Sequence, residues 1–105
     1  MLPSIVDALS DVRVILEAGK ISGARSYCQR LADSGLRDIG FFALYGLVLA
    51  CDADESAAVD CLLTLPHADE LDRSDVLKDI GQAWTRLQYR GNARPYLERA
   101  ARLCH

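Results

Sequence analysis

The sequence predicts an all-α domain in which six helices pair into three hairpins and form a short solenoid. Three observations lead to this prediction. Half of the 105 residues are hydrophobic and only three are proline, and leucine and alanine, which favour helices, are abundant. Apolar residues recur at helical spacing in six segments. Glycine or other turn-forming residues separate these segments, and a chain of this length is expected to fold as one domain over residues 1–105.

The first hairpin is expected over residues 4–34. Its first helix should span residues 3–18, with Ser4 as the N-cap because a hydroxyl can accept a hydrogen bond from the first free amides. Gly19 should end this helix, since glycine favours the left-handed conformation found after helix C-termini. The second helix should span residues 22–33.

The second hairpin is expected over residues 38–66 and contains the most hydrophobic stretch of the chain. Its helices should span residues 38–51 and 54–65, separated by a short polar turn. Gly46 in the first helix and Ala58 in the second are small residues that allow the two helices to approach closely. We therefore expect this hairpin to form the centre of the molecule.

The third hairpin is expected over residues 74–104. Its first helix should span residues 74–90, with Ser74 or Asp72 as the N-cap. Gly91 should form the turn and Asn92 should cap the last helix. Pro95 would then lie in the first helical turn, where its missing N–H costs nothing.

The three hairpins repeat the same pattern of small and bulky residues. The first helices align as Ala8-Asp11-Val12-Ile15, Phe42-Tyr45-Gly46-Leu49 and Leu77-Ile80-Gly81-Trp84. The second helices align through Ala24, Ala58 and Tyr96, through Cys28, Leu62 and Ala100, and through Leu31, Leu65 and Leu103. In this alignment the first repeat step is 34 residues and the second is 38.

This pattern resembles the tetratricopeptide (TPR) repeat, a helical hairpin of about 34 residues. The third hairpin matches the first helix of such a repeat well, but Tyr96 stands where alanine is usual and an extra helical turn precedes Gly91. The resemblance covers nearly the whole chain and implies three TPR-like hairpins. An ordinary six-helix bundle is the alternative architecture.

In a TPR array, the first helices of the hairpins line a concave groove. By repeat register, the predicted partner-binding groove contains Val6, Leu9, Arg13, Leu16, Ala43, Leu47, Ala50, Lys78 and Thr85. The groove would be apolar along the first two hairpins, which suits an amphipathic helix. Alternatively, these side chains pack on their own neighbours. The apolar strip of the last helix is either a second interface or folds back around Trp84.

The size, acidity and helix order are also similar to those of the needle-subunit chaperones of bacterial type III secretion systems. The likeness lies in the stretches LEAGKISGARSYCQRLADSG, FFALYGLVLACDADESAAVDCL and AWTRLQYRGNARPYLERAARL. This resemblance implies a cytoplasmic chaperone that covers the amphipathic C-terminal helix of a needle subunit and prevents its polymerisation before export. It also implies a small helical co-chaperone as a second partner.

Two other functions remain open from the sequence. The chain could be a TPR-like scaffold or adaptor that binds a different helical or extended peptide, or forms a homo-oligomer when alone. It could also be a helical regulatory domain of a larger complex, with its binding surface on the last helix rather than in a groove.

Catalysis and nucleic-acid binding are not indicated. The net charge of −3 and the pI near 5.2 do not suit a nucleic-acid partner, which requires a basic face. His67 begins an acidic connector over residues 67–72, where a solvated histidine is expected, and Cys104-His105 alone do not make a metal site. The sequence therefore predicts no enzyme activity, no cofactor and no metal.

The cysteines and the longest apolar stretch indicate the compartment. The four cysteines, Cys28, Cys51, Cys61 and Cys104, have no C-x-x-C spacing and are expected to be free thiols in a reducing compartment, with a disulfide or metal as the alternative. The apolar stretch over residues 41–51 is about half the length that a bilayer requires. We therefore expect a cytoplasmic protein that does not insert into a membrane.

Overall fold

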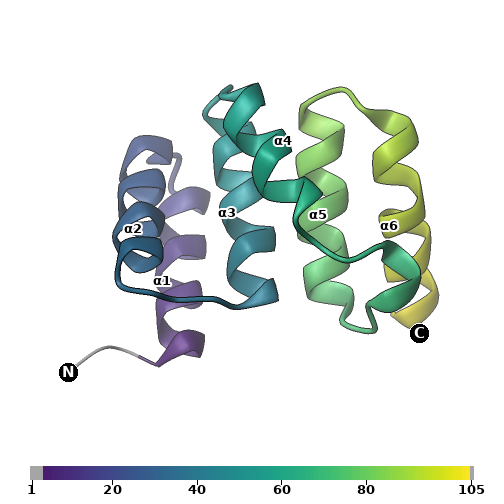
Figure 1. Ribbon diagram of the computed structural model, residues 1–105, viewed down its shortest axis with the longest axis horizontal. Coiled ribbons are helices and arrows are strands. Elements are labelled where there is room, and N and C mark those ends of the chain that lie inside the picture. The colour runs from purple at the N-terminus through teal and green to yellow at the C-terminus, as the bar shows by residue number, and fades with distance from the viewer. Residues whose placement is uncertain (1–3, 105) are drawn as a thin grey trace.

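The computed structural model describes residues 4–104, and this range contains helices and no strand. The elements are α1 (Ile5–Glu17), α2 (Ile21–Asp33), α3 (Ile39–Cys51), α4 (Glu55–Leu63), the short 3-10 helix η1 (Ala68–Glu70), α5 (Ser74–Arg86) and α6 (Arg90–Leu103) (Figure 1). The all-α prediction is confirmed. The bounds of α1 to α4 lie within two residues of those expected, although Pro3, the expected start of the first helix, lies outside the described residues.

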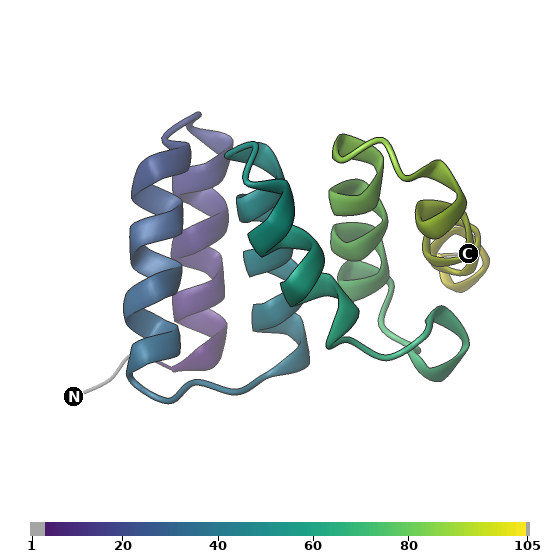
Figure 2. The ribbon, with the colours of Figure 1, turned by 45° about the horizontal axis from the view of Figure 1, so that its top comes forward.

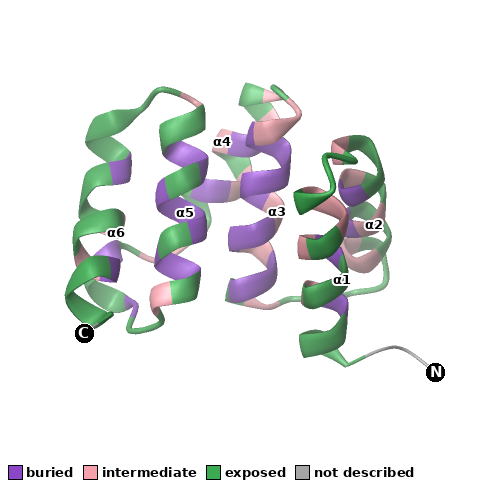
Figure 3. Ribbon diagram, turned by 180° about the vertical axis from the view of Figure 1, so that it is seen from behind, coloured by how far each residue is buried: buried purple, intermediate pink, exposed green. Residues whose placement is uncertain are grey.

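The six helices form three TPR-like hairpins, α1–α2, α3–α4 and α5–α6, which lie side by side along the 37 Å long axis (Figures 1 and 2). Helices α2 and α4 lie on the near side in Figure 1. The first helices α1, α3 and α5 therefore form a row on the opposite side, which Figure 3 shows. This row is the face on which the sequence predicts a groove.

The middle helix α3 is the core of the molecule. Nine of its 13 residues are buried, and Phe41, Leu44 and Val48 are among the largest fully buried side chains. Buried residues therefore occur on all sides of α3, whereas burial on α1 is confined to Ala8 and Val12 (Figure 3). The central position of α3 between two other hairpins explains why its sequence is apolar around its whole circumference.

Gly46 provides the close approach within the central hairpin, as predicted. A Cβ atom at this position would lie 2.6 Å from Cδ2 and 3.1 Å from Cγ of Leu62 on α4. Ala58 on α4 is fully buried. The small residue on α3 therefore sets the distance between the two helices of this hairpin.

Three of the helices begin with a side-chain cap, in which a side-chain oxygen accepts a hydrogen bond from a free amide of the first turn. Ser4 Oγ accepts the N–H of Asp7, the Asp38 carboxylate that of Phe41, and the Asp54 carboxylate that of Ala57. The Ser4 prediction is confirmed. The predicted caps of α5 are wrong, because Arg73 occupies the N-cap position and makes no side-chain capping bond.

The turn of the third hairpin lies earlier than the sequence suggested. Helix α5 ends at Arg86 and α6 begins at Arg90, so the predicted turn at Gly91 and the predicted Asn92 cap are wrong. Gln88 takes the left-handed conformation instead, with φ at 69°. The ring of Tyr89 packs edge-on against Trp84, and its hydroxyl donates to Glu55 of the neighbouring hairpin. These contacts position the turn, and Pro95 consequently lies beyond the first turn of α6.

The earlier turn also corrects the repeat register. Ala93, which is buried, and not Tyr96, takes the place that Ala24 and Ala58 occupy in the first two hairpins, since each is the fourth residue of its helix. Leu97 follows and packs against Gly81 of α5. The repeat steps are therefore 34 and 35 residues, and no extra helical turn is present.

Candidate functional site

The predicted groove residues all lie on α1, α3 and α5, but the structure divides them by exposure. Val6, Lys78 and Thr85 are exposed, Leu9, Arg13 and Leu16 are partly buried, and Ala43, Leu47 and Ala50 are buried. Val6 is 74% exposed, whereas Leu47 is only 4% exposed. The ends of the row are thus open and its middle is closed, so the accessible apolar residues of the predicted set lie on α1. Their role in partner binding stays a prediction.

An ion pair spans the closed middle of this row. Arg13 Nη2 on α1 donates to Asp79 Oδ2 on α5 at 2.6 Å. Helix α3 lies between α1 and α5 (Figure 3), so the pair connects the first and third hairpins across the central one. Asp79 is the one charged residue among the buried ones in the described range and is 6% exposed.

Burial and the ion pair with Arg13 shift the pKa of the Asp79 carboxyl in opposite directions. Burial raises the pKa of its carboxyl, and the hydrogen bond and charge of Arg13 only partly oppose that effect. The same hydrogen bond raises the pKa of the Arg13 guanidinium. Burial therefore disfavours the charged form of Asp79 and Arg13 favours it, which are the two opposing effects in a buried ion pair.

Asp79 was not among the predicted site residues, because a single acidic residue in an amphipathic helix is usually solvated. A signal was nevertheless present, because Asp79 follows Val76 by three residues and precedes Ala83 by four, and both of these are buried. Its position therefore places it on a covered face of α5.

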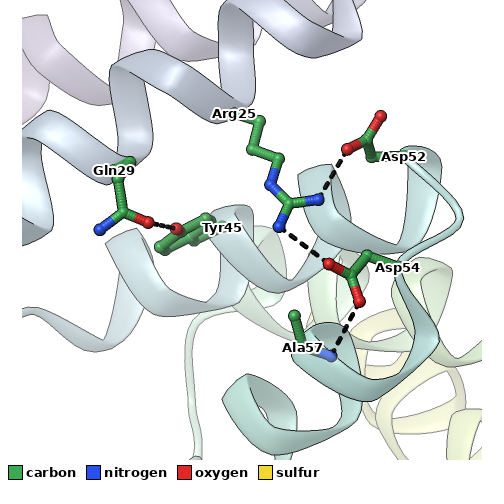
Figure 4. Close-up of polar contacts among 6 residues, drawn as sticks. All are labelled: Arg25, Gln29, Tyr45, Asp52, Asp54 and Ala57. Carbon is green, nitrogen blue, oxygen red and sulfur yellow. Dashed lines mark hydrogen bonds and ion pairs between the residues drawn. The ribbon is translucent and has the colours of Figure 1, made fainter.

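A second polar contact joins the first hairpin to the second. Arg25 on α2 donates to Asp52 Oδ2 at 2.7 Å and to Asp54 Oδ2 at 2.8 Å, on either side of the α3–α4 turn (Figure 4). Tyr45 on α3 donates its hydroxyl to Gln29 on α2. Asp54 therefore caps α4 and also binds Arg25, and both contacts, with that of Arg25 the larger, lower the pKa of its carboxyl.

Replacing Arg25 by glutamine should loosen the first hairpin without unfolding the rest. We expect faster hydrogen exchange of the α1 and α2 amides and unchanged exchange in α5 and α6, because local opening follows the weakest contacts.

The pH should have a related effect. Since the pKa of Asp54 is lowered, the contribution of Asp54 to stability is present above the ordinary carboxyl pKa and is lost as the pH falls through the lowered value. Acid should therefore loosen the same hairpin in the unchanged protein.

The matched control for this experiment is Arg30→Gln, which removes an exposed arginine from the same helix. Equal exchange in the Arg25 and Arg30 variants would show that the two ion pairs do not hold the first hairpin in place.

A cleft of about 730 Å³ opens on the other side of the molecule, between α4 and α6. Leu62, Leu65 and Trp84 supply apolar lining, and α6 supplies Arg94, Arg99 and Arg102. Arg94 pairs with Glu98, and Arg99 Nε donates to the carbonyl of Leu71. The cleft thus combines an apolar surface with arginine side chains on one wall. No sequence pattern indicates this cleft, because its existence depends on the distance between α4 and α6.

The possible metal ligands and the cysteines of the described residues lie apart from one another or are buried. No three His, Cys, Asp or Glu side chains within residues 4–104 lie close enough together to hold a metal ion. The four cysteines are free, and burial raises the pKa of Cys28 to about 12 and of Cys61 to about 11, so neither forms a thiolate readily. Within the same range, no helix combines the length and hydrophobicity needed to cross a bilayer.

Comparison with known proteins does not identify a family. No protein-family model matches the chain, and no curated protein or solved structure is significantly similar to it. The fold is therefore known from the structure itself, and the likeness to needle-subunit chaperones remains a prediction from sequence.

Proposed function

We propose that the protein is a cytoplasmic chaperone that binds an amphipathic helix of a self-assembling partner, such as a type III secretion needle subunit. The binding face would be the row formed by α1, α3 and α5. The observation that supports this most directly is the apolar surface of α1, where Val6 is exposed and Leu9 and Leu16 are only partly covered. A small helical co-chaperone would complete the complex.

The arrangement of the row supports a helical partner rather than a charged peptide terminus. Covering one leucine-sized side chain contributes about 2 kcal/mol, so a helix laid along α1 gains stability from a few apolar contacts. The cationic groups predicted for this face are Arg13 and Lys78, and Arg13 already binds Asp79. Arg13 is therefore already engaged and is not available to hold the carboxylate of a peptide terminus.

The test uses the purified protein and the partner that co-purifies with it, identified by mass. The partner should polymerise when purified alone, as followed by light scattering, and stay monomeric in a 1:1 mixture with this protein. Val6→Glu and Leu9→Glu should each weaken the complex at least tenfold, because they place a charge on the apolar face of α1. Circular dichroism checks that both variants remain folded.

The matched control is Leu103→Glu, which adds the same charge to an exposed leucine on α6, outside the row and outside the lining of the cleft. It should leave the complex intact. If binding survives both α1 variants, the row is not the binding site. If the partner does not polymerise alone, the chaperone function is wrong and an adaptor function takes its place.

A further inference from the structure

The helices at the two ends of the molecule have opposite charge. Helix α1 contains three acidic residues and one basic residue, a net charge of −2, whereas α6 contains four basic residues and one acidic residue, a net charge of +3. The first hairpin and α6 lie at opposite ends of the long axis (Figure 1). An acidic helix and a basic helix therefore lie at the two ends of the stack (Figure 1).

The outer face of α1 is acidic and apolar. Val6 and Val14 are exposed, Val14 to 63%, and the acidic residues Asp7, Asp11 and Glu17 are exposed on the same helix. Within the described chain, α1 packs on α2 and α3 and reaches α5 through the Arg13–Asp79 ion pair. This face therefore has apolar side chains that no part of residues 4–104 covers.

The cleft between α4 and α6 is apolar and basic, which complements the apolar and acidic outer face of α1. Its lining includes Leu62, Leu65 and Trp84, and Leu63 at its edge is 67% exposed. Arg94, Arg99 and Arg102 are opposed there by Glu98 and Asp69, which leaves a net positive charge. A helix with apolar side chains and flanking carboxylates suits such a cleft.

We propose that the outer face of α1 docks into the α4–α6 cleft of a second copy of this chain. The contact must be between molecules, because α1 lies at the far end of the stack from α6, which forms one wall of the cleft (Figure 1). It joins different surfaces of the two copies, so each molecule can use both of its ends. Helical solenoids need polar surfaces at both ends to avoid such stacking, whereas α1 and the α4–α6 cleft each combine charged groups with exposed apolar side chains.

The first measurement is sedimentation velocity of the purified protein over a range of concentrations, at 50 mM and 500 mM NaCl. The average mass should rise with concentration at low salt. It should fall at high salt, because the Debye length shortens to a few ångströms and the acidic and basic surfaces attract each other less. A monomer at every concentration, or association that salt does not weaken, would overturn the proposal.

The second measurement uses two variants that each remove one surface. Val14→Glu disables α1 and leaves the cleft intact, and Leu63→Glu disables the cleft and leaves α1 intact. Both positions are exposed, so both variants should fold. Each should be monomeric alone, and their 1:1 mixture should form a dimer and nothing larger, because only one productive contact remains.

Other outcomes of the mixing experiment would contradict the proposal. If only Val14→Glu abolishes association, the contact joins two copies of α1 and the cleft has no part in it. If both variants are monomeric and the mixture stays monomeric, the two surfaces do not bind each other. Arg102→Glu provides a second cleft variant and should behave as Leu63→Glu does.

Discussion

Replacing Gly46 by valine is expected to lower the free energy of unfolding by about 2–3 kcal/mol. A Cβ at this position would approach Leu62 Cδ2 to 2.6 Å. Leu62 is itself buried, so it cannot rotate away without disturbing the core, and the two branches of valine would add further overlap. Urea unfolding followed by circular dichroism measures the change, because a domain of this size usually unfolds in one cooperative transition.

The matched control is Gly91→Ala. Gly91 lies near the start of α6, and a Cβ there meets nothing within 4 Å. Alanine is the better helix former, so this variant should be more stable by up to about 1 kcal/mol. Equal losses at Gly46 and Gly91 would contradict the helix spacing in the central hairpin and would return Gly91 to the turn that the sequence suggested.

Replacing Arg13 by methionine should destabilise the protein by about 2 kcal/mol at pH 7. The change removes the partner of Asp79 and leaves a buried carboxylate without a compensating charge. The expected loss is smaller than the roughly 3–5 kcal/mol seen for fully buried pairs, because the Arg13 side chain is partly exposed and its interaction is screened by water. Arg102→Met, at an exposed arginine of α6, should change stability by less than about 0.5 kcal/mol.

The pH dependence gives an independent check of the Arg13 prediction. The pKa of Asp79 is raised in the folded protein, so its effect on stability becomes less favourable as the pH rises from the ordinary carboxyl pKa through the raised one. Without Arg13 the folded pKa should be higher still, so the loss caused by Arg13→Met should be larger at pH 7 than near pH 4.

A double-mutant cycle separates the ion pair from packing. Replacing Asp79 by leucine in the Arg13→Met protein should recover most of the lost stability, because an apolar side chain can occupy that covered position without desolvating a charge. If the double variant is no more stable than Arg13→Met, the ion pair does not control stability at this position.

The sequence by itself determined the helices and much of their register. Ser4 and Asp54 cap the helices that they were expected to begin, and Gly19 ends α1 with φ at 80°. These features depend on residues a few positions apart, so a linear pattern is sufficient to recognise them. The small Gly46 was also recognisable, because glycine in an apolar helix indicates close packing.

The tertiary structure alone decided the third turn. A sequence pattern favours glycine for a left-handed residue, yet Gln88 takes that conformation and Gly91 does not. The deciding contacts are those of Tyr89 with Trp84 and with Glu55, which is 34 residues away in the chain. Contacts of that sequence separation leave no local pattern to read.

The tertiary structure also decided which part of the predicted groove is open. The nine predicted residues lie on α1, α3 and α5, but repeat register does not say how deeply each helix is buried. Leu47 is buried because α3 has a hairpin on each side, whereas Val6 is exposed because α1 has a neighbour on one side only. Asp79 lies within reach of Arg13 because α1 and α5 pack on either side of α3 (Figure 3). The sequence of α5 alone does not specify that arrangement.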